Sequence, residues 1–207
     1  METKSSGRSR IIVFGAAGRV GRAAVAEARL RGHAVTEAGR VDGDVTDPEA
    51  VVALANGHDA AIVAVYDSGA RPGDFFPAVA RALAEGLPKA GVKRLVSVGL
   101  ASVLPTASGD LLMDTPGYPQ EWREFYVGHG AGTEALRSAA AAAPEALDWL
   151  VLSPAGDFDH EGEPTGGYAV APAAADSRIT PADFARALLD EIEEPTLKQV
   201  HVGVAAA

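Results

Sequence analysis

Short apolar runs alternate with amphipathic segments along most of the chain. Ile11–Phe14 and Ala60–Val65 are rich in β-branched and small apolar residues, a pattern typical of strands that are buried on both faces. The remaining predicted strands cover 33–37, 94–98, 148–152 and 199–204, with a further short strand ending near 42–45.

Helical periodicity fills the intervals between these strands. The predicted helices cover 22–31, 48–55, 76–90, a segment ending at 134–142, and 181–193. Gly32 is suited to end the first helix, and Asp47 followed by Pro48 is a typical helix start. The third helix is expected to weaken near Gly86 and Pro88, because both residues are poor helix formers.

The glycine-rich segment 128–132 leaves the start of the fourth helix open. Either the helix begins near Thr133, or these glycines allow a close approach of another backbone.

Alternating strands and helices predict an α/β fold with a doubly wound, mainly parallel sheet and helices on both faces. We expect one domain over residues 10–207, preceded by a disordered tail at 1–9. The loops at about 100–121 and 155–180 follow strands. They should therefore lie at the carboxyl edge of the sheet, where such folds bind ligands.

The amino-acid composition excludes several kinds of functional site. The chain has 207 residues and no cysteine, which excludes disulfides, cysteine-ligated metals and thiol nucleophiles. Its net charge of −10 disfavours nucleic-acid binding, and no apolar run is long enough to span a membrane. A cytoplasmic location is expected. No metal site is expected, since the acidic stretch 157–163 is more typical of a solvated loop and the other histidines, His33, His58 and His201, are scattered.

The strongest motif lies between the first strand and the first helix. It reads Gly15-Ala16-Ala17-Gly18-Arg19-Val20-Gly21. Gly15 permits a tight turn, Gly18 permits close approach of a pyrophosphate, and Gly21 permits packing of the helix on the sheet. No Walker lysine follows. The motif predicts a Rossmann-type dinucleotide site formed by these turn residues, with phosphates at the helix amino end.

The end of the second strand bears on the choice of cofactor. Glu37 could bind a ribose hydroxyl, whereas Arg40, together with Arg19, could bracket a 2′-phosphate. With Glu37 inside the strand and Arg40 just past it, the sequence favours NADP(H) over NAD(H).

The order of motifs resembles the NAD(P)H-binding, NmrA-like group of atypical short-chain dehydrogenases, especially small bacterial proteins of the epimerase/dehydratase type. Biliverdin and flavin reductases are more distant relatives. The resemblance covers nearly the whole chain and is carried by 12–21, 33–36, 43–47, 94–96, 148–149, 153–155, 177–180, 183–185 and 188–193.

The resemblance implies further cofactor contacts. Asp44 and Val45 match the pair beside the adenine, and Ala64, Val65 and Tyr66 match the segment beside the adenine ribose. Gly99 to Ser102 match the segment that faces the nicotinamide, and Ser153, Pro154 and Ala155 match the segment beside its carboxamide.

The chain departs from typical short-chain dehydrogenases at the catalytic positions. Tyr126 is followed four places later by Gly130, so the usual Tyr-x-x-x-Lys pair is missing. The usual serine is also replaced, with Gly99 nearest its position and Ser102 displaced. The standard catalytic machinery of that family is therefore not present.

Other residues could supply a proton. His129, Tyr126 and Ser102 are the catalytic candidates, with Tyr118 as a further one. His129 resembles in position a histidine of the biliverdin and flavin reductases. The aromatic residues Trp122, Phe125, Tyr126 and Phe158 could form a wall for a planar or aromatic small-molecule substrate.

These features favour an NADPH-dependent oxidoreductase that reduces a small carbonyl, quinone-like or conjugated substrate by hydride transfer. Two alternatives stay open: a redox-neutral enzyme (a cyclase, epimerase or dehydratase), and a non-catalytic NADP(H)-sensing regulator. Oligomers are compatible with the sequence, which does not indicate a substrate or a pathway.

Overall fold

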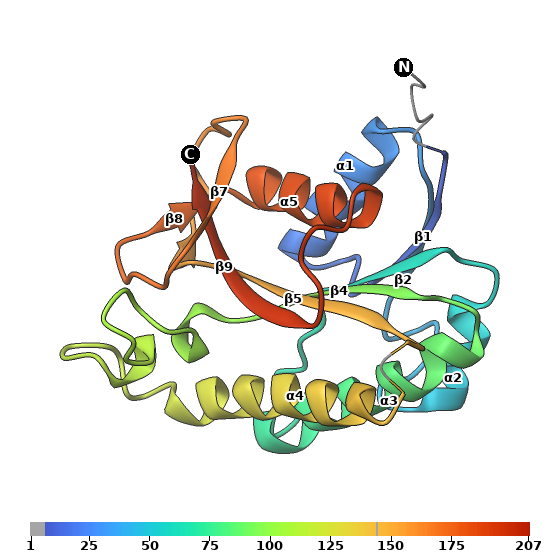
Figure 1. The fold of residues 1–207 in the computed structure, drawn as a ribbon, viewed down its shortest axis with the longest axis horizontal. Helices are drawn as coiled ribbons and strands as arrows, with labels where there is room; N and C mark the ends of the chain where they lie inside the picture. Colours follow the sequence, from blue (N-terminus) through green and yellow to red (C-terminus); the bar gives the residue numbers. More distant parts are fainter. Residues whose placement is uncertain (1–6, 144) are drawn as a thin grey trace.

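A seven-stranded sheet forms the centre of the computed structural model, which describes residues 7–143 and 145–207 (Figure 1). Most of the expected tail at 1–9 lies outside the described residues. The strand order is β2-β1-β3-β4-β5-β9-β7, and all neighbours pair in parallel except β7 and β9. The strands are β1 (Arg10–Phe14), β2 (Ala34–Ala38), β3 (Ala60–Val63), β4 (Arg94–Val98), β5 (Asp148–Pro154), β7 (Tyr168–Ala171) and β9 (Val200–Ala206). The predicted fold class is confirmed.

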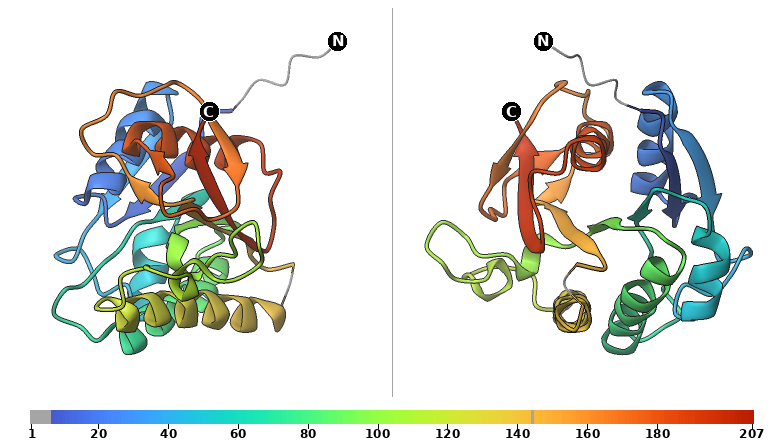
Figure 2. Two further views of the ribbon diagram at one scale, coloured as in Figure 1. Left: turned by 90° about the vertical axis from the view of Figure 1, so that its left-hand side faces the viewer. Right: turned by 45° about the vertical axis from the view of Figure 1, so that its right-hand side comes forward.

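Five helices cover the two faces of the sheet. On one face, α1 (Arg19–Leu30) packs beside α5 (Pro181–Glu193). On the other, α3 (Pro72–Lys89) lies between α2 (Pro48–Ala55) and α4 (Arg123–Ala141) (Figure 2). Each face has its own apolar core of fully buried side chains, with Trp149 and Leu83 in one and Phe184 and Leu150 in the other. The chain thus buries two cores against one sheet, as the alternating pattern requires.

The predicted short strand ending near 42–45 is wrong. These residues form an irregular turn, in which side chains bind nearby groups instead of a neighbouring strand. Asp42 Oδ2 accepts the Gly39 N–H at 2.8 Å, and Asp44 Oδ1 accepts the N–H and hydroxyl of Thr46 at 2.9 and 2.7 Å. Aspartates that satisfy local polar groups in this way favour turns over strands.

Two helices begin earlier than predicted. The first starts at Arg19 instead of Arg22, so part of the glycine motif is already helical. The third starts at Pro72 instead of Phe76, and it continues through Gly86 and Pro88 without interruption. A Cβ at Gly86 would lie 2.8 Å from the Pro48 carbonyl oxygen, so this glycine allows α2 to pack closely.

The fourth helix starts at Arg123, and its glycines serve close packing. A Cβ at Gly128 would lie 2.6 Å from Pro72, and one at Gly132 would lie 2.8 Å from Phe76. Both contacts are with α3, which runs beside α4 (Figure 2). Of the two open interpretations of residues 128–132, the close approach is confirmed.

The loop expected at 155–180 contains three short strands. β6 (Asp157–Phe158) and β8 (Arg178–Ile179) form a two-stranded sheet, and β7 forms the antiparallel edge of the main sheet. The loop at 100–121 contains two short 3-10 helices, η1 (Ala101–Val103) and η2 (Leu112–Asp114). Both loops therefore form an ordered wall beside the ends of β4 and β5.

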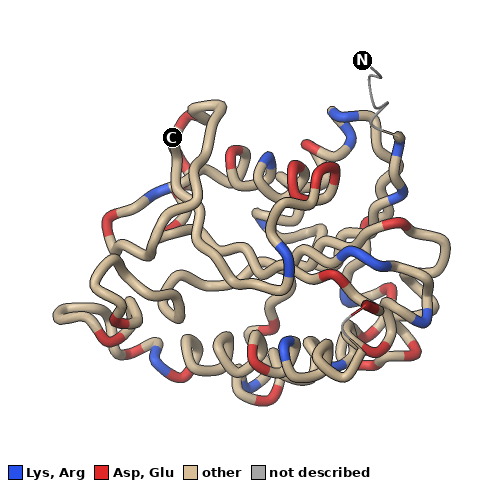
Figure 3. The backbone as a smooth tube through the Cα atoms, viewed as in Figure 1, with Lys and Arg blue, Asp and Glu red and all other residues tan. Residues whose placement is uncertain are grey.

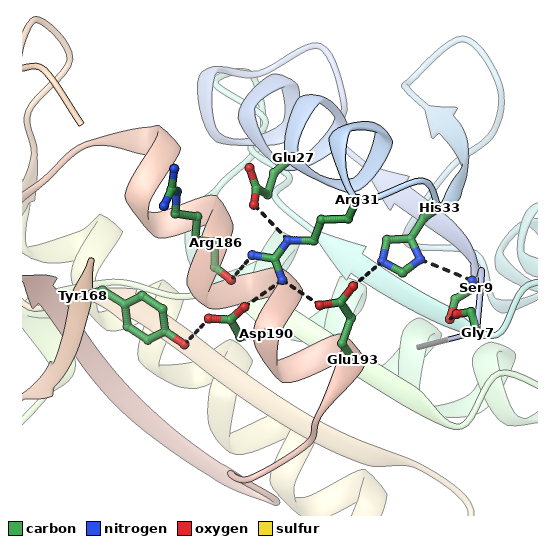
Figure 4. A network of polar contacts seen from close by, with 9 residues as sticks. All are labelled: Gly7, Ser9, Glu27, Arg31, His33, Tyr168, Arg186, Asp190 and Glu193. Carbon is green, nitrogen blue, oxygen red and sulfur yellow. Dashed lines mark hydrogen bonds and ion pairs between the residues drawn. The ribbon is translucent and has the colours of Figure 1, made fainter. Parts of the chain in front are cut away.

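A polar network joins α1, α5 and β7 (Figure 4). The Arg31 guanidinium binds Glu27, Asp190 and Glu193, each at 2.7–2.8 Å. These carboxylates raise the pKa of Arg31, and the three contacts fix the angle at which α1 meets α5.

His33 extends the same network to the start of β1. Its Nδ1 accepts the Ser9 N–H at 3.2 Å, and its Nε2 lies 2.9 Å from Glu193. The network lies on the α1 side of the sheet and serves packing there.

Charged residues lie mainly on the outer helices and loops (Figure 3). In β1, β4 and β5 the only charged residue is the first one, at the amino end, and β3 has none. The carboxyl ends of these central strands are therefore uncharged, and any charge at that edge comes from the loops.

Candidate functional site

The glycine turn has the close contacts that its sequence predicts. Gly15 has a φ of 79°, and a Cβ there would lie 2.2 Å from the Ala64 carbonyl oxygen. A Cβ at Gly21 would lie 2.1 Å from the Gly15 carbonyl oxygen. Both positions therefore accept only glycine, and the turn can bring its backbone directly against a ligand.

Gly18 is the N-cap residue of α1, and the first turn of this helix contains no acidic residue. Unpaired N–H groups and the positive end of the helix dipole lie at this point. The arrangement is suited to the pyrophosphate of a dinucleotide, with Ala17, Arg19 and Val20 beside it.

A pocket of about 330 Å³ adjoins the glycine turn. It contains several residues that the resemblance implied as adenosine contacts. Its lining consists of Phe14, Gly15, Ala38, Gly39, Arg40, Gly43, Asp44, Val45, Val65, Tyr66, Asp67 and Phe75. Asp44 holds the turn by its bonds to Thr46, which lower the pKa of its carboxyl.

The three residues expected to decide between NAD and NADP lie in different places, and only Arg40 lines the pocket. Arg40 lines the pocket and forms an ion pair with Asp67 at 3.0 Å. Glu37 lies within β2 and binds Arg29 of α1 at 2.7 Å, so its carboxylate is held toward the α1 side. Arg19 lies in the first turn of α1 and does not line this pocket.

Gly99, which directly follows β4, has no room for a side chain. A Cβ there would lie 2.5 Å from Val151, 2.6 Å from Ser153 Oγ and 2.9 Å from His201 Nε2. Ser153 Oγ and His201 Nε2 are themselves 2.7 Å apart, across β5 and β9. A hydroxyl from the neighbouring strand therefore occupies the space beside Gly99, where typical relatives carry a serine.

Pro154 and Ala155 continue β5 beyond this pair. The Ala155 N–H donates to the Val204 carbonyl at 2.7 Å, and the Ala174 N–H donates to the Ala155 carbonyl at 2.8 Å. These bonds fix the segment that the resemblance places beside the carboxamide.

His129 faces a small cavity of about 50 Å³ that Gly99, Ser97 and Thr133 also line. Its imidazole lies over the ring of Phe76, with centroids 3.8 Å apart. Burial, and to a lesser degree the nearby His201, lower the pKa of His129 to about 4. The imidazole is therefore neutral near pH 7.

A second, larger pocket of about 490 Å³ lies beyond Leu100. Aromatic, proline and polar side chains from both loops and from α4 form its walls. The lining residues are Leu100, Leu112, Thr115, Pro116, Gly117, Tyr118, Pro119, Trp122, Tyr126, Gly156, Asp157, Ala175 and Arg178. Its volume and lining are typical of sites for small organic molecules.

Two tyrosines face each other in this pocket. The rings of Tyr118 and Tyr126 have centroids 5.4 Å apart. Burial raises the pKa of both phenols, and Asp157 raises both further. Each hydroxyl therefore keeps its proton over the physiological pH range and can donate it in a hydrogen bond.

Ser102 is fully buried in η1. Its hydroxyl has no hydrogen-bond partner in the part of the chain that the structure describes. Of the three predicted catalytic candidates, Tyr126 lines the larger pocket, Ser102 is buried in η1, and His129 lines the smaller cavity.

Aromatic contacts connect the first pocket with the small cavity beside Gly99. Tyr66 of the first pocket packs edge-on against Phe125 at 5.5 Å, and Phe125 packs against His129 at 5.0 Å. Trp122 lines the second pocket, whereas Phe158 packs against Phe184 at 5.1 Å and belongs to a core. Of the four residues predicted to form an aromatic wall, Trp122 and Tyr126 line the second pocket and Phe125 and Phe158 do not; Tyr118 lines it in addition.

Sequence reasoning missed His201, Asp67 and Arg178 as site residues. His201 looked isolated because its partner Ser153 is 48 positions away in the chain, and only the pairing of β5 with β9 brings them together. Within residues 7–143 and 145–207, no three metal-ligating side chains form a group that could hold a metal ion. No helix in that part of the chain is long and apolar enough to cross a membrane.

Comparisons with known proteins agree with this geometry. Residues 15–195 match the model of a family described as NAD(P)H-binding. The chain is 32% identical over 206 residues to the uncharacterized protein YwnB of Bacillus subtilis, covering 91% of this chain and 94% of YwnB.

Solved structures share the fold along nearly the whole chain. A proposed exported protein of Burkholderia pseudomallei is 30% identical with a TM-score of 0.80, covering 95% of this chain and 99% of that one. A proposed NADH-flavin reductase of Streptococcus pneumoniae is 26% identical with a TM-score of 0.76, covering 96% and 100%. A proposed epimerase of Bacteroides thetaiotaomicron is 26% identical with a TM-score of 0.81, covering 97% and 98%.

Proposed function

Because the chain belongs to the NAD(P)H-binding family, we propose that it is an NADPH-dependent oxidoreductase that reduces a small, planar carbonyl, quinone-like or conjugated substrate by hydride transfer. One observation carries the proposal. The adenosine-type pocket and the aromatic pocket both lie at the carboxyl ends of the central strands, the first beside Gly15 and Val65 and the second beside Leu100 and Gly156. A dinucleotide along these strand ends would bring its nicotinamide to the aromatic pocket.

The chain's own residues fit this cofactor. Gly15 and Gly21 leave room that any side chain would fill, and the amino end of α1 is suited to the pyrophosphate. Arg40 supports a preference for NADPH, because it lines the pocket while Glu37 is held by Arg29. Bound NADPH would supply the hydride, and the protein would supply orientation and a proton.

Tyr126 is the residue that we propose as proton donor, with Tyr118 beside it. Burial and Asp157 raise the pKa of Tyr126, so it is protonated when an oxygen anion would develop on a substrate. His129, which is neutral, packs between Phe76 and Phe125 at the smaller cavity and is not assigned a proton-transfer role. No lysine is needed, since the phenol donates a proton and is not required as a base.

The names of similar proteins lend support of a general kind. One relative is a proposed NADH-flavin reductase, and flavins are planar conjugated molecules of the class that an aromatic pocket would accept. Another is a proposed epimerase, which keeps redox-neutral chemistry as an outcome that the experiment must be able to detect.

The test is NADPH consumption by the purified protein with a panel of quinones, enones and aromatic aldehydes, followed by the absorbance of NADPH. We expect turnover with at least one class, and a loss of about 10²-fold or more in Tyr126→Phe with NADPH affinity retained. Tyr66→Phe is the control, because it removes a tyrosine hydroxyl on the adenosine side. NADPH binding without consumption across the panel would favour a sensor or a redox-neutral enzyme instead.

A further inference from the structure

The aromatic pocket contains one positively charged side chain, Arg178 of β8. Its Nη1 donates to the backbone carbonyls of Ala175 and Ser177 at 2.9 and 2.8 Å. These two bonds anchor one edge of the guanidinium to the loop. These bonds thus hold the side chain beside the pocket.

The remaining donors of Arg178, Nε and Nη2, bind no group within residues 7–143 and 145–207. In the part of the chain that the structure describes, no carboxylate lies within ion-pair distance of this guanidinium. This differs from Arg31, Arg94 and Arg123, which each bind at least one acidic side chain. An anchored arginine with open Nε and Nη2 groups at a pocket is suited to bind a carboxylate or a similar planar anion.

The one acidic residue of the pocket lies opposite Arg178 in the strand pairing but does not neutralise it. Asp157 and Arg178 are register partners in β6 and β8. Asp157 Oδ1 instead accepts the Phe158 N–H at 2.8 Å, and the Asp157 charge raises the pKa of Tyr118 and Tyr126. Asp157 thus leaves Arg178 without a carboxylate partner among the described residues, and the positive charge of this guanidinium is available to an anionic group.

We propose that the substrate carries an acidic group, which Arg178 binds, on a planar ring system that the walls formed by Tyr118, Trp122 and Tyr126 enclose. The reducible group then lies at the tyrosine side, away from the anion. This inference rests on the proposed function, because it takes the aromatic pocket to be the substrate pocket.

The test compares two bicyclic ligands of the same shape, 2-naphthoate and its uncharged amide, 2-naphthamide. Neither is reduced, so titration calorimetry in the presence of saturating NADP⁺ measures binding without turnover. We expect the wild-type protein to bind 2-naphthoate about tenfold more tightly than 2-naphthamide, as one charged hydrogen-bonded contact would give.

Two variants assign the preference to Arg178. Arg178→Ala should remove the difference between the two ligands. Arg178→Gln should remove it too while keeping an amide donor for the carbonyls of Ala175 and Ser177, so a loosened loop can be told from a lost charge. Arg186→Ala is the matched control, because this arginine binds the Gly166 carbonyl and does not line the pocket.

Equal affinities in the wild-type protein, no binding of either ligand, or an unchanged preference in both Arg178 variants would each overturn the proposal. A parallel NADPH titration of the same proteins separates this from a failure of the proposed function. If NADPH does not bind, the oxidoreductase assignment fails; if NADPH binds and the naphthoate preference is missing, only the acidic-substrate assignment fails.

Discussion

Nη2 of Arg40 lies 3.0 Å from Oδ1 of Asp67, and both residues line the pocket beside the glycine turn. The arginine that could bind a 2′-phosphate is therefore paired with a carboxylate before any ligand arrives. Most of the Arg40 side chain is exposed, at 72%, so the pair is weak and exchangeable. A phosphate with two charges would compete well for this guanidinium.

Asp67→Asn should therefore raise the affinity for NADPH, by up to about fivefold, since an exposed ion pair is worth at most about 1 kcal/mol. Arg40→Ala should lower NADPH affinity about tenfold or more and leave NADH affinity nearly unchanged. Fluorescence titrations with both nucleotides measure these changes. Arg186→Ala is the control, because this arginine of α5 binds the Gly166 carbonyl and lines neither pocket. An equal loss for NADPH and NADH in Arg40→Ala would remove the proposed phosphate contact.

Gly18→Asp should separate stability from cofactor binding. Gly18 has φ −69° and ψ 167°, which any residue can adopt, and aspartate is a favourable N-cap residue. The variant should therefore melt no earlier than the wild-type protein, yet its carboxylate would lie against the pyrophosphate and abolish binding. Gly18→Ser, which caps without charge, should retain part of the affinity. Unchanged NADPH affinity in Gly18→Asp would be incompatible with a phosphate site at this helix end.

Gly99→Ala should destabilise the fold by about 1–3 kcal/mol, the usual cost of forcing a methyl group into a packed site. The reason is the space already taken by Val151, Ser153 and His201, all within 2.9 Å of the missing Cβ. Urea unfolding monitored by intrinsic tryptophan fluorescence, to which Trp122 and the buried Trp149 contribute, measures this cost. Gly73→Ala is a fitting control, because nothing lies within 4 Å of a Cβ at that position. A neutral Gly99→Ala would show that the Ser153–His201 pair does not fill the space beside β4.

Two partly buried histidines, His129 and His201, make the fold sensitive to acid. Burial lowers the pKa of His129 and of His201 to about 4 each, below the ordinary value of 6.5, so the unfolded chain binds more protons than the folded one in this interval. Their contribution is complete above about pH 6.5 and is lost as the pH falls toward about 4, by up to about 3 kcal/mol per imidazole.

Replacement of one imidazole should flatten this dependence. The free energy of unfolding of His129→Leu should decrease less between about pH 7 and pH 5 than that of the wild-type protein. His58→Leu is the control, since His58 lies at the surface between Thr36 and the end of α2. If the two proteins lose the same free energy over this range, His129 is charged in the folded state.

The chain's local patterns were sufficient to predict the fold and the geometry of the glycine turn. Gly15, Gly18 and Gly21 are close in sequence, and their spacing alone specifies the turn. The same is true of Asp47 and Thr180, which cap α2 and α5 through side-chain bonds to Glu49 and Asp183. Contacts within a few residues can be predicted because the chain itself fixes them.

What could not be predicted depends on long-range packing. The glycines at 128 and 132 weaken a helix by propensity, but their contacts with α3 override that preference. Ser153 meets His201, and Arg178 meets the wall from Tyr118 and Trp122, only after the sheet and its edge strands have formed. The substrate end of the site is formed by such long-range contacts, so its residues could not be identified from local sequence patterns.

Deuterium labelling of the cofactor detects hydride transfer from NADPH to the substrate directly. The protein is incubated with NADPH that carries deuterium at one or the other C4 position, together with planar aromatic aldehydes and enones, with and without a carboxylate. These substrates keep the transferred atom on carbon, where mass spectrometry detects it. If the protein transfers a hydride, the product contains one deuterium from only one of the two labelled cofactors. Tight NADPH binding with no deuterium in any product would contradict hydride transfer.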